Sequence, residues 1–259
     1  GVQTCALPIS RRKFIRQLSQ SALLFGMSPL EQKAAAQHFE ERLLIPEKKY
    51  SANDMIRIAV IGTGIMGHND LTTALRIPGV ELAAACDLYS GRLTRMKELY
   101  GQQLFTTRDY REVMQRKDID AVIIATSDHY HARISREALA SGKHVYCEKP
   151  MVHRFQEGPG VIDSWKQSGK TMQVGSQGIS GLLFSKAREL YRSGEIGVLN
   201  CIEASTDRQS ANGAWQYTLP TDGDPTTVDW DSYIAGMPKQ PWDANKFLDR
   251  KSTRLNSSH

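Results

Sequence analysis

The sequence has 259 residues, of which 40% are apolar and 24% charged, and its formal net charge is +5. These proportions are typical of a folded globular protein with room for one large or two ordinary domains. No apolar run reaches the roughly 18 residues of a membrane-spanning helix, so we expect no membrane span. The positive charge raises the question of a nucleic-acid partner.

The two ends of the chain share one DNA string. Residues 249–257 can be encoded by GATCGGAAGAGCACACGTCTGAACTCC, and the reverse complement of that string encodes residues 1–9. Because this string resembles a common sequencing-library adapter, we expect residues 1–9 and 249–259 not to be native. The natural segment is then about residues 10–248, cut from a longer gene.

Basic residues near these ends account for the net charge. The adapter-derived tail contributes +2, and a further +4 comes from Arg11, Arg12, Lys13 and Arg16. The remainder has a formal charge of −1. We therefore expect no nucleic-acid partner.

The cysteines and histidines do not predict a metal site. Cys86, Cys147 and Cys201 form no C-x-x-C pair, and two of them lie in apolar runs, which favours buried free thiols. His129 and His131 are close in sequence, but no carboxylate or cysteine completes a metal site with them. We expect these histidines to lie at a helix start instead.

Residues 10–36 resemble a twin-arginine export signal. Arg11 and Arg12 precede an aromatic and an aliphatic residue, a modest apolar stretch follows, and residues 34–36 are the small alanines that a signal peptidase needs. The alternative is a basic amphipathic helix start. With the signal, the protein would be periplasmic or otherwise exported; without it, cytoplasmic. Residues 37–54 are charged and polar and are predicted to be a linker.

A strand followed by a glycine loop and a helix opens the main domain. Residues 57–61 are a β-branched run, the pattern of a buried parallel strand, and residues 68–75 have helical character. Between them, the first glycine permits the tight turn, the second lets the backbone approach a pyrophosphate, and the third lets the helix pack on the strand. The helix start attracts phosphate. We expect the dinucleotide to contact the loop residues Gly62, Thr63, Gly64, Ile65, Met66 and Gly67.

An acidic residue at the end of the next strand predicts the cofactor. Residues 80–86 form a second apolar run that ends on Asp87, 20 residues after Gly67. At that spacing a carboxylate meets the adenosine ribose hydroxyls and repels a 2′-phosphate, which favours NAD over NADP. Arg92 lies close enough to contact the cofactor and to weaken this preference. The alternative role for Asp87 is a helix N-cap.

Strands and helices continue to alternate along the chain. Further strands are predicted at residues 121–126, 144–147 and 171–174, and helices at residues 92–99, 110–115, 132–140 and 158–168. This alternation predicts a Rossmann-type doubly wound parallel sheet. Ligands bind such sheets beyond the carboxyl ends of the strands. Gly62, Asp87, Thr126 and Glu148 all fall at such ends, so one crevice is expected.

Three motifs carry a family resemblance: residues 60–67, residues 126–131 (TSDHYH) and residues 148–150 (EKP). Together they resemble the Gfo/Idh/MocA oxidoreductases, which act mainly on sugars, polyols and cyclitols, and the resemblance runs from about Met55 to Phe247. It implies an NAD-binding domain over residues 55–174. It also implies the start of a truncated α+β substrate domain with a mostly antiparallel sheet over residues 175–248.

The resemblance assigns roles to residues beyond the glycine loop. Thr126 and Ser127 would line the nicotinamide side of the cofactor, and His131 would support that loop. Glu148 would contact the cofactor ribose. Lys149, aimed by a cis bond before Pro150, would face both substrate and nicotinamide and act as the catalytic residue. From chemistry alone, an ammonium there can hold the reacting hydroxyl and shift its proton; the alternative is a surface lysine paired with Glu148.

The second domain is only partly represented. Gln177 is a candidate substrate contact, although Gly178 stands where members of the family often have an arginine. The family's catalytic aspartate and histidine would follow Phe247. Residues 183–192 are predicted to be a helix and residues 199–205 a strand. A long loop then holds aromatic residues that either stack on a sugar or pack against a core: Trp215, Tyr217, Trp230 and Trp242.

Three functions fit this pattern. The first is reversible hydride transfer between NAD and a secondary alcohol of a small carbohydrate-like substrate. The second is an NAD-dependent glycoside hydrolase of the same fold that uses transient oxidation, and the third is a non-catalytic dinucleotide sensor. We also expect the full-length protein to form homo-oligomers through its C-terminal sheet, and the present chain to be poorly active and prone to aggregate.

Overall fold

The computed structural model describes residues 51, 54–203 and 220–248. The predicted export signal, most of the predicted linker, Trp215, Tyr217 and the adapter-derived ends lie outside the described residues. The division into two domains near residue 174 stays a prediction.

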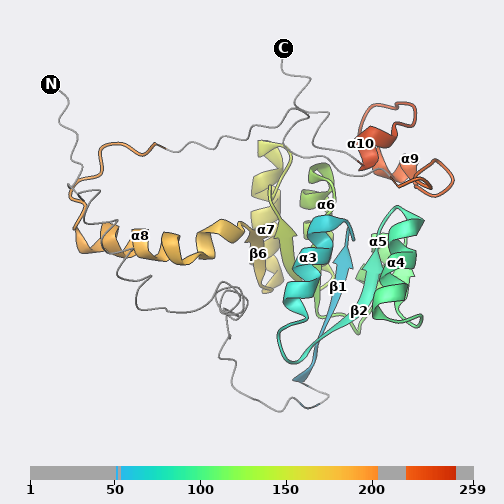
Figure 1. Cartoon of the computed structure of the whole chain (residues 1–259), viewed down its shortest axis with the longest axis horizontal. Coiled ribbons are helices and arrows are strands. Elements are labelled where there is room, and N and C mark those ends of the chain that lie inside the picture. The colour runs from blue at the N-terminus through green and yellow to red at the C-terminus, as the bar shows by residue number, and fades with distance from the viewer. Residues whose placement is uncertain (1–50, 52–53, 204–219, 249–259) are drawn as a thin grey trace, which may run out of the picture. The chain divides into compact units, whose positions relative to one another are not determined.

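Six parallel strands form one sheet in the order β3-β2-β1-β4-β5-β6. Figure 1 labels β1, β2 and β6 of this sheet among the helices that surround it. Their bounds are β1 Ile56–Ile61, β2 Val80–Cys86, β3 Phe105–Thr107, β4 Ala121–Ile124, β5 His144–Glu148 and β6 Met172–Gly175. Strand order reverses at β1, which lies between β2 and β4. In doubly wound folds the ligand crevice opens at this switch point, beyond the carboxyl ends of the strands.

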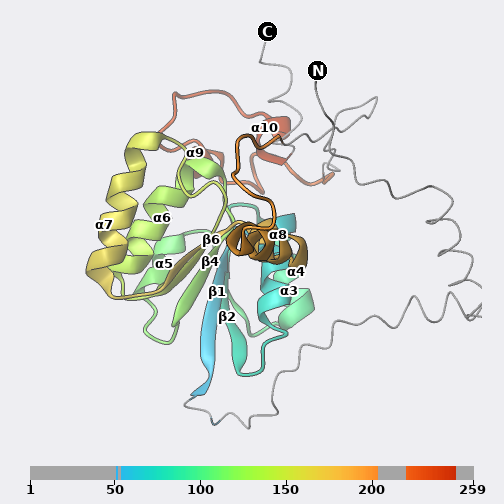
Figure 2. The same ribbon diagram turned by 90° about the vertical axis from the view of Figure 1, so that its left-hand side faces the viewer.

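Helices cover both faces of the sheet. Figure 2 shows α5, α6 and α7 on one side and α3 and α4 on the other. The bounds are α3 Ile65–Ala74, α4 Ser90–Tyr100, α5 Tyr110–Gln115, α6 Asp128–Ala140 and α7 Gly158–Ser168. No helix in the described part of the chain is long and apolar enough to cross a membrane.

The alternation of side chains along β1 produces two cores. Ala59 and Ile61 pack with buried residues of α5 and α6, whereas Ile58 and Val60 pack with Leu71 of α3 and with α4. Successive strand residues point to opposite faces, so a strand covered by helices on both sides must be apolar throughout. This requirement explains the near-continuous β-branched run that identified β1 in the sequence.

The buried cysteines follow the same rule. Cys86 at the end of β2 and Cys147 in β5 are free and buried, as predicted, whereas Cys201 is free and exposed. Burial raises the pKa of the Cys147 thiol to about 11 and raises that of Cys86 well above its ordinary value. Both thiols therefore stay protonated at neutral pH and act as small apolar side chains.

Past the sheet, the described chain is helical or irregular. The 3₁₀ turn η3 Gln177–Ser180 precedes α8 Leu182–Ser193, and the short helices α9 Trp230–Tyr233 and α10 Ala244–Leu248 lie near the end. A second 3₁₀ turn, η2 Phe155–Glu157, lies earlier, between β5 and α7. The strand predicted at residues 199–205 is wrong for its described part, because residues 199–203 are neither helix nor strand. A strand needs a hydrogen-bonded neighbour, and β propensity by itself does not supply one.

The other predicted elements are present; β2, α5 and α7 have the predicted bounds, and the rest have shifted ends. Helix α3 begins at Ile65 rather than His68, and α6 begins at Asp128 rather than Ala132. In both cases the helix starts directly at the loop that follows a strand, so its first N–H groups lie at the crevice. Strand β3 was not predicted, since its three residues are too few to show a pattern.

Candidate dinucleotide site

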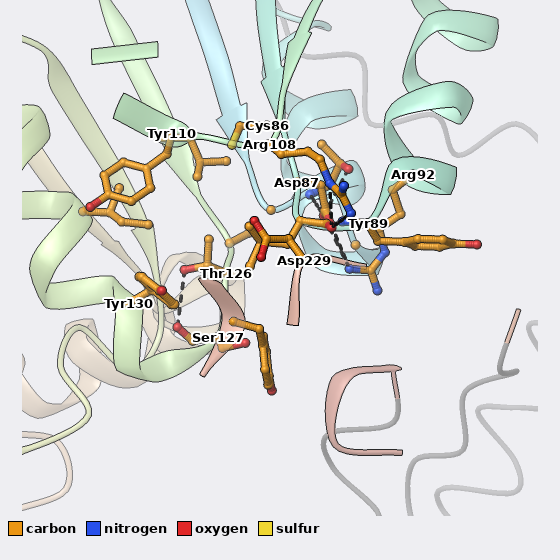
Figure 3. Close-up of a pocket in the computed structure, with 18 of the residues that line it drawn as sticks. Cys86, Asp87, Tyr89, Arg92, Arg108, Tyr110, Thr126, Ser127, Tyr130 and Asp229 are labelled. Carbon is orange, nitrogen blue, oxygen red and sulfur yellow. Dashed lines mark hydrogen bonds and ion pairs between the residues drawn. The ribbon is translucent and has the colours of Figure 1, made fainter. Parts of the chain in front are cut away.

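A cavity of about 1040 Å³ lies at the carboxyl end of the sheet. Its walls come from the loops after β1, β2, β3, β4 and β5, together with residues of the segment 220–248. Figure 3 shows Asp87, Arg92 and Arg108 gathered on one side of this pocket and Thr126, Ser127 and Tyr130 on the other. The crevice expected from the sequence is therefore a single pocket.

The glycine loop shapes the pocket beside β1. Gly62 has φ +89°, and a Cβ there would lie 2.6 Å from the carbonyl oxygen of Ala125. A Cβ on Gly67 would lie 1.8 Å from the carbonyl oxygen of Gly62, so this glycine lets α3 pack against the loop. At Gly64 a Cβ would meet only the Arg92 guanidinium, 3.5 Å away, so this side of the loop is open for a phosphate to approach.

Asp87 is held by the same loop. Its Oδ2 accepts hydrogen bonds from the backbone N–H of Thr63 at 2.8 Å and from the Thr63 hydroxyl at 3.2 Å, and its Oδ1 accepts one from the N–H of Tyr89 at 3.0 Å. Arg92 lies 3.4 Å from Oδ2. The side chain of Asp87 is only 4% exposed. A buried carboxylate fixed by two backbone N–H groups is oriented before any ligand arrives.

The loop after β4 is tied to the loop after β5. The ring of His131, in α6, is 1% exposed, and its two nitrogens face the carbonyl oxygens of Thr126 at 3.1 Å and Pro150 at 2.6 Å. The Lys149–Pro150 bond is cis, as the resemblance implied. One buried ring thus fixes the spacing between Thr126 and the residues that follow Glu148.

Glu148 ends β5 inside a small polar cluster. It is 4% exposed, and its Oε1 accepts hydrogen bonds from the hydroxyl of Tyr146 at 3.5 Å and from the side-chain amide of Gln177. Asp70 on α3 faces this group. Desolvation, and secondarily the charge of Glu148, raise the pKa of Asp70 to about 6. Gln177, the candidate substrate contact, therefore contacts Glu148, the predicted ribose-binding residue, and does not itself line the pocket.

Lys149 lies at the mouth of the pocket. Its side chain is exposed while it still contributes to the lining. Among the described residues, no ion pair joins it to Glu148. Lys149 is therefore a pocket residue whose side chain is exposed to solvent.

His129 has a structural partner. Its Nε2 lies 2.9 Å from the carbonyl oxygen of Tyr233, and it is the second residue of α6, in keeping with the predicted position at a helix start. Within residues 51, 54–203 and 220–248, no group of three or more His, Cys, Asp or Glu side chains could hold a metal ion.

The pocket also contains residues that were not predicted. Of the predicted cofactor residues, all but Gly67 line it. Arg108, Asp229, Tyr233 and Phe247 line it as well. Arg108 could have been predicted only if β3 had been predicted, because Arg108 directly follows the end of that strand. The other three become recognisable only through contacts between distant segments.

Comparison with known proteins agrees with this geometry. Residues 56–176 match the sequence model of the Gfo/Idh/MocA oxidoreductase family, described as an NAD-binding Rossmann fold. These residues form a Gfo/Idh/MocA cofactor domain. The match spans all six strands and supports a nicotinamide cofactor; it ends where η3 begins.

Relatives of the domain include dehydrogenases and glycosidases. Inositol 2-dehydrogenase of Salmonella typhimurium is 31% identical over 144 residues, which cover 55% of this chain and 43% of the relative. A glycosyl hydrolase family 109 protein of Shewanella baltica is 34% identical over 129 residues, which cover 47% and 28%. The crystal structure of myo-inositol 2-dehydrogenase from Lactobacillus plantarum superposes with a TM-score of 0.52 at 28% identity, covering 55% of this chain and 42% of that one. The chain thus spans less than half the length of these relatives.

Proposed function

We propose that this chain supplies the cofactor half of an NAD-dependent oxidoreductase that acts on a CH–OH group of a sugar, polyol or cyclitol. The observation that carries the proposal is the single pocket in which the glycine loop, Asp87, Thr126 and Lys149 meet. The dehydrogenases among the relatives support the substrate class. The bound nicotinamide would supply hydride transfer, and the protein would supply placement and proton handling.

Each residue then has a physical task. The open side of Gly64 and the first N–H groups of α3 would receive the pyrophosphate. Asp87 would accept hydrogen bonds from the adenosine ribose, and Glu148 from the ribose near the nicotinamide. Thr126 and Ser127, at the start of α6, would border the nicotinamide. Lys149 would hold the reacting hydroxyl and take part in moving its proton.

We propose NAD rather than NADP as the cofactor. Support comes from the buried carboxylate of Asp87, whose negative charge would oppose a 2′-phosphate in the same place. The positive charge of Arg92 acts in the opposite direction, because its guanidinium lies within 4 Å of the Asp87 carboxylate. The two side chains together therefore set the preference.

Replacing Asp87 tests this assignment. Asp87→Asn keeps an oxygen acceptor for the Thr63 N–H but removes the charge and its charge-assisted hydrogen bonds. The affinity for NADH should fall about ten-fold or more, and the preference for NADH over NADPH should shrink. Fluorescence titration with both nucleotides measures the two effects. The exposed Asp163→Asn is the matched control; an unchanged preference in Asp87→Asn would remove the specificity role.

Lys149→Ala tests the catalytic assignment, in a chain extended by its native continuation. We expect kcat to fall about 100-fold or more, since positioned acid–base groups contribute on that scale. The NADH dissociation constant should change far less than kcat. Absorbance at the nicotinamide band, with inositols and simple polyols as substrates, gives the rate. Unchanged turnover would eliminate Lys149 as the catalytic residue.

A second function, glycoside hydrolysis through transient oxidation, is favoured by the relatives named glycosyl hydrolase family 109 proteins. The same pocket would then keep NAD bound through the whole cycle. Release of free sugar from an aryl glycoside without net formation of NADH would support this alternative. Net reduction of NAD by a polyol would support the dehydrogenase.

We also propose export by the twin-arginine route. Support comes only from the sequence of residues 10–36. A reporter fused behind this segment should reach the periplasm, and replacing Arg11 and Arg12 by Lys should stop it. Export that continues without the arginine pair would contradict the proposal.

A further inference from the structure

Residues 220–248 form part of the pocket wall, although they lie outside the part of the chain matched to the cofactor family. Asp229, Ser232 and Tyr233 line the cavity, as do Pro220, Ala235 and Phe247. In Figure 3, Asp229 lies between the group formed by Asp87 and Arg108 and the group formed by Thr126 and Ser127. We call residues 220–248 the strap.

The strap is bonded to the loop after β2 through Thr227 and Asp229. The N–H of Ser90 donates to the carbonyl of Thr227, and the N–H of Asp229 donates to that of Leu88, both at 2.9 Å. Arg108 joins the same two carbonyls, since its Nη2 donates to Leu88 at 3.1 Å and to Thr227 at 2.7 Å. Three anchors therefore hold the strap beside residues 88–90, which directly follow Asp87.

The other contact is with the start of α6, across the crevice. The ring of His129 lies 2.9 Å from the carbonyl oxygen of Tyr233, and the hydroxyl of Tyr130 donates to the carbonyl of Ser232. Residues 227–233 thus connect the loop that follows β2 to the loop that follows β4. The loop after β2 carries Asp87, the proposed contact of the adenosine ribose, whereas the loop after β4 carries Thr126 and Ser127, proposed to border the nicotinamide. The bonds to Leu88 and Ser90 therefore place residues 227–229 of the strap on the adenosine side of the pocket.

The strap brings aromatic surface to this place. Tyr89, Trp230, Tyr233 and Phe247 belong to one buried cluster. The Arg92 guanidinium carbon lies 5.9 Å from the centre of the Tyr89 ring and 5.8 Å from that of Phe247. Arg92 therefore joins the strap to Asp87 and to the glycine loop. Ring faces beside a fixed cation form a surface suited to a purine base.

We propose that the strap closes the adenosine half of the dinucleotide site, with Phe247 as part of its wall and Arg108 as its anchor. The proposal rests on the proposed cofactor function and adds a binding element that lies outside the Rossmann domain. It requires no contact between the strap and the nicotinamide half.

ADP-ribose, which keeps the adenosine half and lacks nicotinamide, is the probe that tests the strap. Phe247→Ala should lower the affinity for ADP-ribose and for NADH by the same factor, about ten-fold, which is the scale of one base-stacking contact. Arg108→Met removes the hydrogen bonds to the carbonyls of Leu88 and Thr227. It should weaken the binding of both ligands to a similar extent. Lys246→Ala, at the neighbouring exposed residue that does not line the pocket, is the control. Calorimetry on the 259-residue chain gives the dissociation constants.

Hydrogen exchange on the unmodified chain gives a readout that does not depend on variant folding. Amides of residues 227–235 should exchange more slowly when ADP-ribose is saturating. The proposed role of the strap is overturned if exchange at these amides does not change. It is also overturned if both variants bind ADP-ribose as tightly as the unmodified chain does. Failure of the unmodified chain to bind NADH is a different result, because it overturns the proposed cofactor function and with it the ligand of the strap.

Discussion

Asp70 makes the stability of the folded chain depend on pH. Its Oδ2 is buried and has no hydrogen-bond partner among the described residues. Desolvation and the charge of Glu148 raise its pKa to about 6 from 3.8. The folded state therefore binds more protons than the unfolded state between about pH 4 and pH 6. In that window the free energy of unfolding falls as the pH rises.

We expect Asp70→Asn to remove this pH dependence. The amide carries no charge to desolvate and no longer repels Glu148. Unfolding by urea should show a gain of about 1 kcal/mol or less at pH 7, because Asp70 is partly exposed and water screens its charge. At pH 4 the gain should be close to zero. Asp163→Asn, which alters an exposed carboxylate, is the control; a gain that is equal at both pH values would contradict the assignment to Asp70.

At the scale of elements, the start of α3 combines two constraints that look alike in the sequence. Gly67 is needed because the helix packs against the backbone of Gly62, with no room for a Cβ. Gly64 has room for a Cβ in the absence of ligand, and only the Arg92 guanidinium is near. The first glycine therefore serves the fold, and the second is open to the ligand.

Replacing each of these two glycines by alanine should affect different properties, stability in one case and NADH binding in the other. Gly67→Ala should lower the free energy of unfolding by more than about 2 kcal/mol, because the contact is with backbone and the helix must shift. Gly64→Ala should leave stability within about 0.5 kcal/mol and weaken NADH at least ten-fold by blocking the pyrophosphate. Thermal unfolding and fluorescence titration measure the two effects. Gly160→Ala, inside α7 with its nearest neighbour 3.6 Å away, is the control expected to alter neither.

At the scale of the whole molecule, the described chain leaves apolar surface uncovered. Leu182 and Leu183 on α8 are 82% and 86% exposed, and Val198 beyond it is 85% exposed. In the described part of the chain, β6 pairs only with β5, so one edge of the sheet has no partner strand. Exposed apolar patches and free strand edges both favour association between chains.

We therefore expect the 259-residue chain to self-associate. Light scattering after size exclusion should show species larger than a monomer at micromolar concentration. Leu183→Lys should reduce their fraction, because it places a charge on the apolar face of α8. Ile77→Lys, at a half-exposed apolar residue after α3, should have little effect. A monodisperse monomer with an intact α8 would contradict the expectation.

Local patterns predicted the parts of the fold that depend on neighbours in sequence. The apolar runs of β1, β2 and β5 are continuous because helices bury both sheet faces. The glycine loop and the spacing to Asp87 follow from the same strand–turn–helix unit. Where the pattern was too short, as at β3, or had no partner, as at residues 199–203, prediction failed.

The sequence by itself thus determined the Rossmann sheet, its crevice and the residues of the glycine loop and strand ends that line it. Only the tertiary structure decided that Arg108 and residues 220–248 complete the wall. The physical reason is that these contacts join residues far apart in the sequence. Arg108 bonds to a carbonyl 119 residues away, and the hydroxyl of Tyr130 to one 102 residues away. The acceptors in these contacts are backbone carbonyls, which every residue carries, so the residue type at the acceptor position does not predict them.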